Sequence, residues 1–232
     1  MTRLILFDID GTLLKPGDTA HQQALIDAVR AVYQIEASLD GVPLGGMLDS
    51  QIVRLALEKH DVPTSDIRAG LTEAMEQMGR RYVELLDGDE RRSWLLPGVE
   101  ELVARMELEF LLSVLTGNAS GVARAKLAAA GIDRYFPFGA YGDSADHRHE
   151  LVPVAIGHAE RATGDAPRPS DVLIVGDTPR DIEAARESGA RVLAVATGRY
   201  SVDVLAEHQP DILLPDLGDV DHVVRSVRDL TG

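Results

Sequence analysis

The sequence has no cysteine among its 232 residues, only three lysines, and no more than 4% aromatic residues. The missing cysteines exclude disulfides, thiolate metal sites, cysteine nucleophiles and iron–sulfur clusters. No apolar run reaches the roughly 20 residues that a membrane span needs, so we expect no membrane partner. An acidic residue stands at position 8, which is too early for a signal peptide, and we therefore expect a cytoplasmic protein.

Acidic residues outnumber basic residues by 38 to 23, which gives a formal net charge of -15. Such a charge repels nucleic acid and anionic lipid unless a local basic patch overrides it. The closest candidate for a basic patch consists of Arg80, Arg81, Arg91 and Arg92. Acidic residues are interleaved with these arginines, which indicates a solvated surface. We therefore expect no nucleic-acid partner, whereas the excess of carboxylates is compatible with binding a divalent cation.

Short apolar runs along the chain predict buried parallel strands. They fall at residues 4–7, 110–115, 172–175, 192–195 and 211–214. Helical patterns separate or follow them, at residues 99–106, 118–130, 151–162, 179–188 and 220–230. Strands that alternate with helices predict a parallel sheet in a three-layer α/β sandwich.

Residues 16–92 interrupt this alternation. Helical patterns at 17–33, 48–60 and 64–86 follow one another with no convincing strand between them, and Gly, Pro and Asp are frequent at both ends. A length of 232 residues allows one or two domains. We therefore expect a core formed by residues 1–15 and 93–232, and a helical domain, residues 16–92, inserted after the first strand.

Acidic, hydroxyl-bearing and glycine residues follow three of the expected strands. Asp8 and Asp10 come after the first, Thr116-Gly117-Asn118 after the second, and Asp177 after the strand at 172–175. Ligands of parallel sheets bind at the carboxyl ends of the strands. Clustered carboxylates without His or Cys favour Mg²⁺, and glycines with Thr116 offer donors to phosphate oxygens. A carboxylate beside Mg²⁺ can attack phosphorus, so these parts suit phosphoryl transfer.

Three segments resemble motifs of the haloacid dehalogenase superfamily in order and spacing. They are Asp8-Ile9-Asp10-Gly11-Thr12, Leu115-Thr116-Gly117-Asn118 and Gly176-Asp177-Thr178-Pro179-Arg180-Asp181. The resemblance covers nearly the whole chain. It implies a doubly wound, Rossmann-like core, and residues 16–92 stand where this family carries a helical cap domain.

The resemblance also implies roles for individual residues. Asp8 would be the nucleophile and Asp10 the general acid and base. Asp8, the main-chain carbonyl of Asp10, and Asp177 would hold Mg²⁺. Thr116, Gly117 and Asn118 would bind the transferred phosphoryl group. Asp181 would lie behind them and orient metal-bound water or a nearby cation.

The activity that the resemblance implies is a Mg²⁺-dependent phosphatase acting through an aspartyl-phosphate, similar to phosphoglycolate phosphatases. Asp10 favours phosphate monoesters, because the dehalogenase and phosphonatase branches lack an acid at that position. Gly176 stands where the mutase branch usually has a further acid. We expect a small phosphorylated substrate and a monomer or weak homodimer. A phosphomutase or phosphonate hydrolase, and a non-catalytic phosphate-binding protein on this fold, are the alternatives.

The cation of the family's third motif is harder to locate, because none of the three lysines lies after Lys126. Arg148, just before the helix at 151–162, is the best substitute, since its guanidinium offers a fixed charge and a bidentate fork. Lys126 and Arg180 are the alternatives. With Arg148 in this role, Arg148→Ala should lower turnover strongly with little change in melting temperature, and Lys126→Ala should be nearly silent.

Residues 45–49 of the expected cap, which contain a glycine pair, either face the site or merely join two helices. The histidines His21, His60 and His158 lie in helical patterns, and we expect them on helix surfaces.

Overall fold

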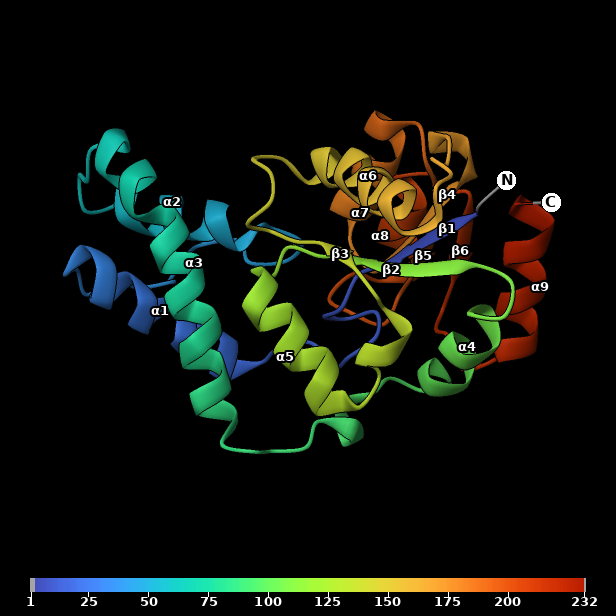
Figure 1. The fold of residues 1–232 in the computed structure, drawn as a ribbon, viewed down its shortest axis with the longest axis horizontal. Coiled ribbons are helices and arrows are strands. Elements are labelled where there is room, and N and C mark those ends of the chain that lie inside the picture. The colour runs from blue at the N-terminus through green and yellow to red at the C-terminus, as the bar shows by residue number, and fades with distance from the viewer. Residues whose placement is uncertain (1–2, 232) are drawn as a thin grey trace.

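A parallel sheet forms the centre of the structure, a computed structural model that describes residues 3–231 (Figure 1). The strand order is β3-β2-β1-β4-β5-β6. The bounds are Leu4–Phe7 for β1, Leu111–Leu115 for β2, Gly139–Ala140 for β3, Val172–Gly176 for β4, Arg191–Val195 for β5 and Ile212–Leu214 for β6. The five predicted strands are therefore confirmed.

The register of the three central strands brings their carboxyl ends to one level. Phe7 of β1 lies opposite Val114 of β2 on one side and Val175 of β4 on the other. Every residue of β1 is buried, as expected for a strand covered on both faces. The polar residues that follow β1, β2 and β4 consequently emerge together at one edge of the sheet.

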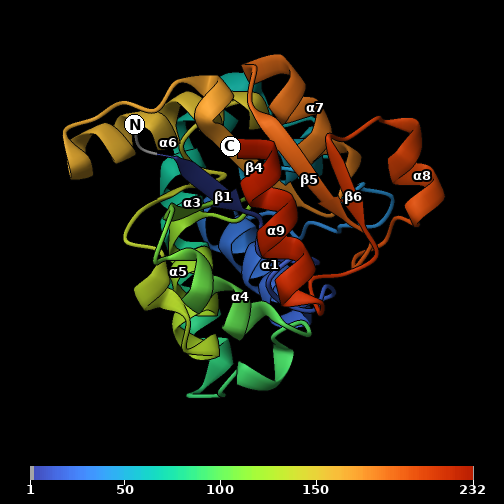
Figure 2. The same cartoon turned by 90° about the vertical axis from the view of Figure 1, so that its right-hand side faces the viewer.

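Helices cover both faces of the sheet (Figures 1 and 2). On one face lie α4 (Val99–Met106), α5 (Ser120–Ala130) and α9 (Val220–Thr231). On the other lie α6 (Leu151–Thr163), α7 (Pro179–Ser188) and α8 (Val202–Glu207). Ile5 and Phe7 contribute to the first apolar cluster, while Leu4 and Leu6 contribute to the second. This arrangement confirms the predicted three-layer α/β sandwich with a doubly wound parallel sheet.

The helical insertion, residues 16–92, lies to one side of the sheet and contains α1 (Thr19–Tyr33), α2 (Asp49–Glu58) and α3 (Thr64–Leu86) (Figure 1). Its apolar cluster continues into α5 of the core through Ala119 and Val122. The closest crossing joins Gly79 of α3 to Gly121 of α5, where a Cβ on Gly79 would stand 2.9 Å from the Gly121 Cα. Only glycine permits this approach, so the insertion packs firmly on the core.

Two elements of the fold have no counterpart in the predictions. Strand β3 has only two residues, one of them Gly139, so it offers no apolar run. Helix α8 is six residues long and begins at Val202, after the capping residue Ser201, whose side chain accepts a hydrogen bond from the Val204 N–H. Short 3₁₀ turns occupy Arg92–Trp94, Asp133–Tyr135, Arg148–Glu150 and Pro169–Asp171.

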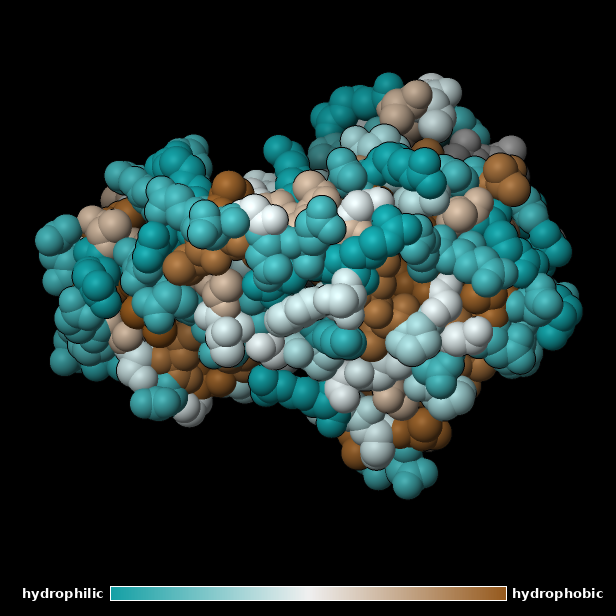
Figure 3. Space-filling model, turned by 90° about the horizontal axis from the view of Figure 1, so that it is seen from below, coloured by the Kyte–Doolittle hydropathy of each residue, from teal (hydrophilic) through white to brown (hydrophobic). Residues whose placement is uncertain are grey.

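The surface seen from below is mostly hydrophilic, with separate apolar patches (Figure 3). This distribution is consistent with the large excess of acidic residues. None of the helices within residues 3–231 has both the length and the hydropathy needed to cross a bilayer.

Candidate active site

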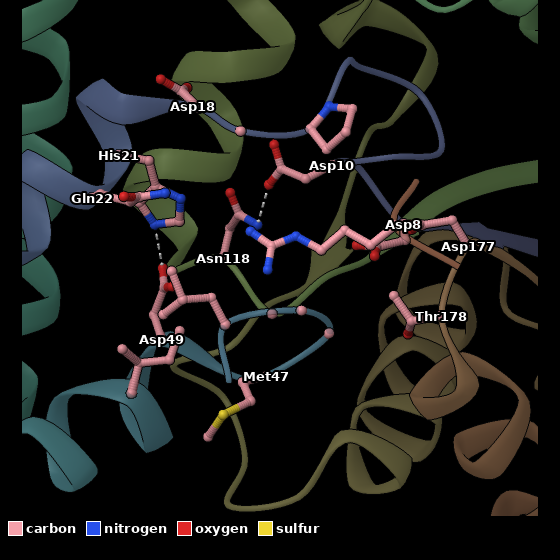
Figure 4. Close-up of a pocket in the computed structure, with 18 of the residues that line it drawn as sticks. Asp8, Asp10, Asp18, His21, Gln22, Met47, Asp49, Asn118, Asp177 and Thr178 are labelled. Carbon is pink, nitrogen blue, oxygen red and sulfur yellow. Dashed lines mark hydrogen bonds and ion pairs between the residues drawn. The ribbon is translucent and has the colours of Figure 1, made fainter. Parts of the chain in front are cut away.

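A pocket enclosing about 120 Å³ lies between the carboxyl ends of the central strands and the helical insertion (Figure 4). The core contributes residues that follow β1, β2 and β4, and the insertion contributes residues of α1 and of the loop before α2. Those discussed below are Asp8, Asp10, Gly117, Asn118, Lys126, Arg148, Asp177, Thr178, His21, Gly46, Met47, Asp49 and Arg199. Polar residues from each of the three motifs thus meet in one pocket, namely Asp8 and Asp10, Asn118, and Asp177 with Thr178.

Asp8 is buried at the end of β1, and its carboxylate lies 3.0 Å from the Arg148 guanidinium. The Ile9 N–H donates a 2.8 Å hydrogen bond to Oδ1, which fixes the orientation of the carboxylate. Burial raises the pKa of Asp8 to about 6, although Arg148 acts in the opposite direction. The carboxylate is therefore held beside a permanent positive charge, an arrangement that suits a nucleophile directed at a phosphate dianion.

Arg148 also binds Asp181, which is completely buried on α7. Its Nε and Nη2 donate to Asp181 Oδ1 at 3.1 and 2.6 Å. Asp181 Oδ2 accepts from the Thr178 N–H at 3.1 Å and from the Thr178 hydroxyl at 2.7 Å. Both oxygens of Asp181 are engaged, so its role is to hold Arg148 and the first turn of α7 in place.

Asp177 follows β4 and faces Asp8. The Thr12 hydroxyl, which is fully buried, donates to Asp177 Oδ1 at 3.3 Å. Burial, reinforced by the Asp8 and Asp181 carboxylates, raises the pKa of Asp177 to about 8. Like charges at this separation disfavour simultaneous ionisation, and a cation between them removes that cost.

The donor set fits a divalent metal ion. Asp8, Asp177 and Asp181 each place a carboxylate oxygen within 4.8 Å of the others. Oxygen ligands of this kind suit hard cations such as Mg²⁺ or Ca²⁺. Asp181 accepts four hydrogen bonds from Arg148 and Thr178, whereas Asp8 and Asp177 have fewer partners and therefore more lone pairs available to a cation.

Asp10 has different partners from Asp8. The Lys126 ammonium donates to Oδ1 at 2.8 Å and to Oδ2 at 2.6 Å, and the Asn118 amide donates to Oδ2 at 2.9 Å. Burial acts to raise the pKa of Asp10, but Lys126 and His21 outweigh it, so the pKa lies below its usual value. Lys126 and Asn118 thus occupy the Asp10 carboxylate, and binding of a metal ion by its main-chain carbonyl stays a prediction.

The residues predicted to bind the phosphoryl group divide into two kinds. Gly117 and Asn118 line the pocket. Thr116 is fully buried behind them, and its hydroxyl accepts a 3.0 Å hydrogen bond from the Asn118 amide. The Asn118 Oδ1 is buried and has no hydrogen-bond partner among the described residues, so an acceptor remains open beside Asp10. Direct phosphoryl contact by Thr116 stays a prediction.

Residues 45–49 of the helical insertion press directly on the core. A Cβ on Gly117 would stand 1.9 Å from the Met47 carbonyl oxygen, and the Asp49 N–H donates to the Gly117 carbonyl at 2.7 Å. Gly46 accepts from Arg148 Nη1 at 3.3 Å. Of the two interpretations left open for this segment, the structure supports the one in which it faces the site.

His21 was expected on a helix surface, and this expectation is wrong. Its side chain is only 15% exposed, and its Nε2 lies 2.9 Å from the Asp49 carboxylate in Figure 4. Its Nδ1 lies 3.2 Å from the Lys126 ammonium. The helical pattern around His21 is correct, but the face that carries it is covered by the core.

Lys126 is a site residue that the sequence indicated only as an alternative to Arg148. It occupies the buried stripe of α5 together with Val122, Ala123, Leu127 and Ala130. Lys126 lies three and four residues after the apolar Ala123 and Val122, on the face of the helix that is buried. A lysine at such a position is a signal in the sequence that could have identified it as a buried residue. Arg148 is confirmed as a pocket residue beside Asp8, yet Lys126 is a second buried cation there, so we no longer expect Lys126→Ala to be silent.

The fold and the site together define a class of proteins, phosphatases with an aspartate pair after the first strand of a parallel sheet. Residues 2–189 match the model of the haloacid dehalogenase-like hydrolases. The chain belongs to this family, and it is an enzyme that hydrolyses phosphate esters.

Individual relatives cover nearly all of the chain. It is 29% identical over 229 residues to a phosphoglycolate phosphatase from Nitrosospira multiformis, with 96% of each chain covered. It is 27% identical over 228 residues to the probable phosphatase IndB from Dickeya dadantii, with 95% of this chain and 92% of the relative covered. CbbY from Rhodobacter sphaeroides, solved with xylulose-(1,5)bisphosphate, matches the fold with a TM-score of 0.70 and 21% identity, over 94% of this chain and 96% of that one.

Proposed function

We propose that the protein is a Mg²⁺-dependent phosphatase of small metabolites that works through an aspartyl-phosphate on Asp8. The observation that carries this proposal is the convergence of Asp8, Asp177 and Arg148 in one buried cluster at the pocket floor. Two carboxylates offer ligands to a cation, and one of them faces a guanidinium that can neutralise an incoming phosphate. We expect the enzyme to act in the cytoplasm, as a monomer or weak homodimer.

In the first step, an Asp8 carboxylate oxygen attacks phosphorus and the bond to the leaving oxygen breaks. Asp10 enters this step in its protonated form and gives that proton to the leaving oxygen, so the product leaves as a neutral alcohol. When bound, Mg²⁺ would be held by Asp8, Asp177 and the Asp10 carbonyl, and it would neutralise phosphoryl charge. The result is an aspartyl-phosphate on Asp8 and an ionised Asp10.

In the second step, the Asp10 carboxylate takes a proton from water as the water oxygen attacks phosphorus. The bond between phosphorus and Asp8 breaks, which releases inorganic phosphate and restores both aspartates. Arg148 remains beside the phosphoryl group throughout, and its guanidinium, which faces Asp8, can bind the phosphoryl oxygens. Asn118 and the Gly117 backbone complete the phosphate pocket.

The helical insertion is proposed to act as a cap over this chemistry, with the core formed by residues 1–15 and 93–232. Support comes from the seating of Met47 on Gly117, which covers the pocket on the side away from the sheet. A covered pocket excludes water that would otherwise compete with the leaving group and weaken the electrostatic contacts. Its small volume admits a metabolite and excludes a folded polymer.

Arg199 makes a carboxylated substrate such as phosphoglycolate a specific candidate. Three cations line the pocket: Lys126 and Arg148 are paired with buried carboxylates, and exposed Arg199 has no ion pair among the described residues. A guanidinium that is not paired with a carboxylate is suited to bind an anionic group of the substrate. The names of several relatives, which are phosphoglycolate phosphatases, agree with this choice.

The surroundings of Gly176 favour hydrolysis over the mutase alternative. A Cβ at this position would lie 2.2 Å from the Asp181 carboxylate carbon, so an acidic side chain before Asp177 would displace Asp181. Asp10 likewise favours a phosphate monoester over a phosphonate, because it supplies the proton that an alkoxide requires. The presence of Asp8, Asp10 and Asp177 together in one pocket favours an enzyme over a non-catalytic binding protein.

Release of phosphate from p-nitrophenyl phosphate, with and without Mg²⁺, tests the proposal. We expect turnover that requires the cation, that is removed by a chelator and that returns when Mg²⁺ is added back. Turnover that survives exhaustive chelation contradicts the metal-dependent mechanism. A folded protein that binds phosphate but releases none from any ester supports the non-catalytic alternative.

A further inference from the structure

Lys126 is a buried cation that the mechanism above does not use. Its side chain is 2% exposed, and a lysine is rarely this buried unless it is paired. It reaches the site from α5, a helix of the core, and contacts both oxygens of Asp10. Arg148 already supplies the positive charge beside the nucleophile, so a second cation beside the acid and base needs an explanation of its own.

We infer that Lys126 is a positioning residue, which fixes the Asp10 carboxylate for proton transfer and ties that orientation to the helical insertion through His21 and Asp49. The inference rests on the proposed role of Asp10. Lys126 contributes no atom to the reaction and acts only through Asp10.

The hydrogen bonds of Asp10 show how the carboxylate is held. Lys126 donates to both oxygens, and Asn118 donates to Oδ2. A carboxylate can accept about four hydrogen bonds, so roughly one position remains for the leaving oxygen or for water. With Lys126 removed, the carboxylate would keep only the Asn118 contact and could rotate away from the substrate. Since proton transfer requires a donor within hydrogen-bond reach, a rotated carboxylate would be a poor acid.

The contacts of His21 extend this network into the helical insertion. The Lys126 ammonium has only donors, so the His21 Nδ1 that faces it at 3.2 Å is the acceptor. The proton of neutral His21 therefore sits on Nε2 and is donated to Asp49 at 2.9 Å. The same Asp49 oxygen accepts from the Ala119 N–H at the start of α5, at 2.7 Å. His21 of α1 therefore links Lys126 of α5 to Asp49 of α2.

This network makes the acid and base complete only when the insertion sits on the core. His21 and Asp49 belong to the insertion, whereas Asp10 and Lys126 belong to the core. Asp8 and its partners Arg148 and Asp181 all belong to the core. On the nucleophile side the insertion contributes one main-chain contact, from the Gly46 carbonyl to Arg148, whereas the acid is held through the insertion side chains His21 and Asp49.

The test compares two substrates in Lys126→Met, since methionine keeps the volume of the side chain and removes its charge. An alkyl phosphate needs a proton on its leaving oxygen, and p-nitrophenyl phosphate does not. We expect kcat for the alkyl phosphate to fall about 10- to 100-fold, as for other groups that orient a reactive residue, with a much smaller fall for the aryl ester. Arg124→Met, which removes an exposed cation from the same helix, is the matched control and should leave both rates unchanged.

Two further variants keep the test decisive if Lys126→Met folds poorly. His21→Asn leaves Lys126 on Asp10 but removes the link to Asp49, and it should give the same substrate-dependent loss at smaller size. In Lys126→Ala, added methylammonium should restore alkyl phosphate turnover, because a free amine can occupy the vacated position. Losses that are equal for both substrates, with no rescue by the amine, would overturn the inference.

A double-mutant cycle separates this inference from the proposed function. If Lys126 acts through Asp10, Lys126→Met should cost little more in an Asp10→Asn background, where the acid is already lost. Suppose that Asp10→Asn lowers kcat for the alkyl phosphate severely and that Lys126→Met lowers it by the same further factor in that background. Lys126 then has another role, and the inference fails while the proposed function stands. If Asp10→Asn is mild on the alkyl phosphate, the acid–base role of Asp10 itself is wrong, and the proposed function fails with it.

Discussion

The two halves of the pocket each pair a buried aspartate with a buried cation, yet they are built differently. In the nucleophile half, Asp8 contacts Arg148, and Asp181 and Thr178 support the guanidinium from α7. All of these residues come from the core. In the acid–base half, Lys126 joins Asp10 to a histidine of the helical insertion. The first half is thus formed by core side chains with one contact to the Gly46 carbonyl of the insertion, whereas the second depends on side chains from both parts of the chain.

The electrostatic result differs as well. Burial outweighs Arg148 and raises the pKa of Asp8 to about 6, whereas Lys126 and His21 outweigh burial and lower the pKa of Asp10. The pKa values of two aspartates two residues apart are therefore shifted in opposite directions. At the nucleophile site three carboxylates, Asp8, Asp177 and Asp181, surround the single cation Arg148, so negative charge is left for a metal ion to offset. At the acid–base site, Lys126 already offsets the charge of Asp10.

The largest expected effect comes from the nucleophile half. Asp8→Asn should abolish turnover, by at least about 10³-fold, because an amide cannot attack phosphorus usefully. The shape of the side chain is retained, so circular dichroism should show a folded protein. Asp203→Asn, an exposed aspartate on α8, is the control and should be silent. Retention of more than a few per cent of the wild-type rate by clean Asp8→Asn protein would remove Asp8 from its role.

Arg148→Ala should come second, with turnover about 10²- to 10³-fold lower, as when one preorganised charge is removed from a transition state. Arg148→Lys should recover part of the rate, since charge returns but the bidentate fork does not. Because Arg148 pairs with two buried carboxylates, we now also expect the melting temperature of Arg148→Ala to fall, contrary to the expectation from sequence. The exposed Arg186→Ala on α7 serves as the control; an Arg148→Ala enzyme with wild-type turnover would contradict the assignment.

A smaller effect is expected at Arg199, a lining residue that belongs to neither half. Arg199→Gln should raise KM for phosphoglycolate about fivefold, because an exposed ion pair is worth up to about 1 kcal/mol. The kcat for p-nitrophenyl phosphate, which has no carboxylate, should not change. If phosphoglycolate is a substrate and its KM is insensitive to Arg199, another group binds the carboxylate.

The smallest expected effect is a dependence of metal-free stability on pH. Asp8 and Asp177 have folded-state pKa values of about 6 and about 8, above the value of 3.8 for an unperturbed aspartate. The folded protein therefore binds more protons than the unfolded chain in this window, and its stability should fall as pH rises from about 4 to about 8.

Thermal melts at several pH values measure this effect. Asp177→Asn should flatten the slope, and Mg²⁺ should raise the melting temperature more at pH 8 than at pH 5, because the ligands must lose their protons to bind. A metal-free melting temperature that rises steadily across the same range would contradict the assigned pKa shifts.

The sequence predicted the nucleophile half well because its information is local. Asp8 and Asp177 directly follow apolar runs, and a parallel sheet places the ends of such runs together. Arg148 could be located because few basic residues precede the helix at 151–162. The acid–base half was predicted only as far as Asp10 and Asn118, since the contact of Lys126 with His21 joins residues 105 positions apart on two different helices. Helical periodicity gives the face of each helix but not which faces meet.

The measurement that tests the central claim most directly is trapping of the phosphorylated enzyme. The wild-type protein, quenched in acid during turnover of a phosphate ester with Mg²⁺, is digested and its peptides are examined by mass spectrometry. We predict a phosphoryl group on Asp8 that hydroxylamine removes, as expected for an acyl phosphate, and none in Asp8→Asn protein. Two results would contradict the account. One is a phosphoryl group trapped on a residue other than Asp8. The other is rapid turnover with no trapped species and with inversion of configuration at phosphorus.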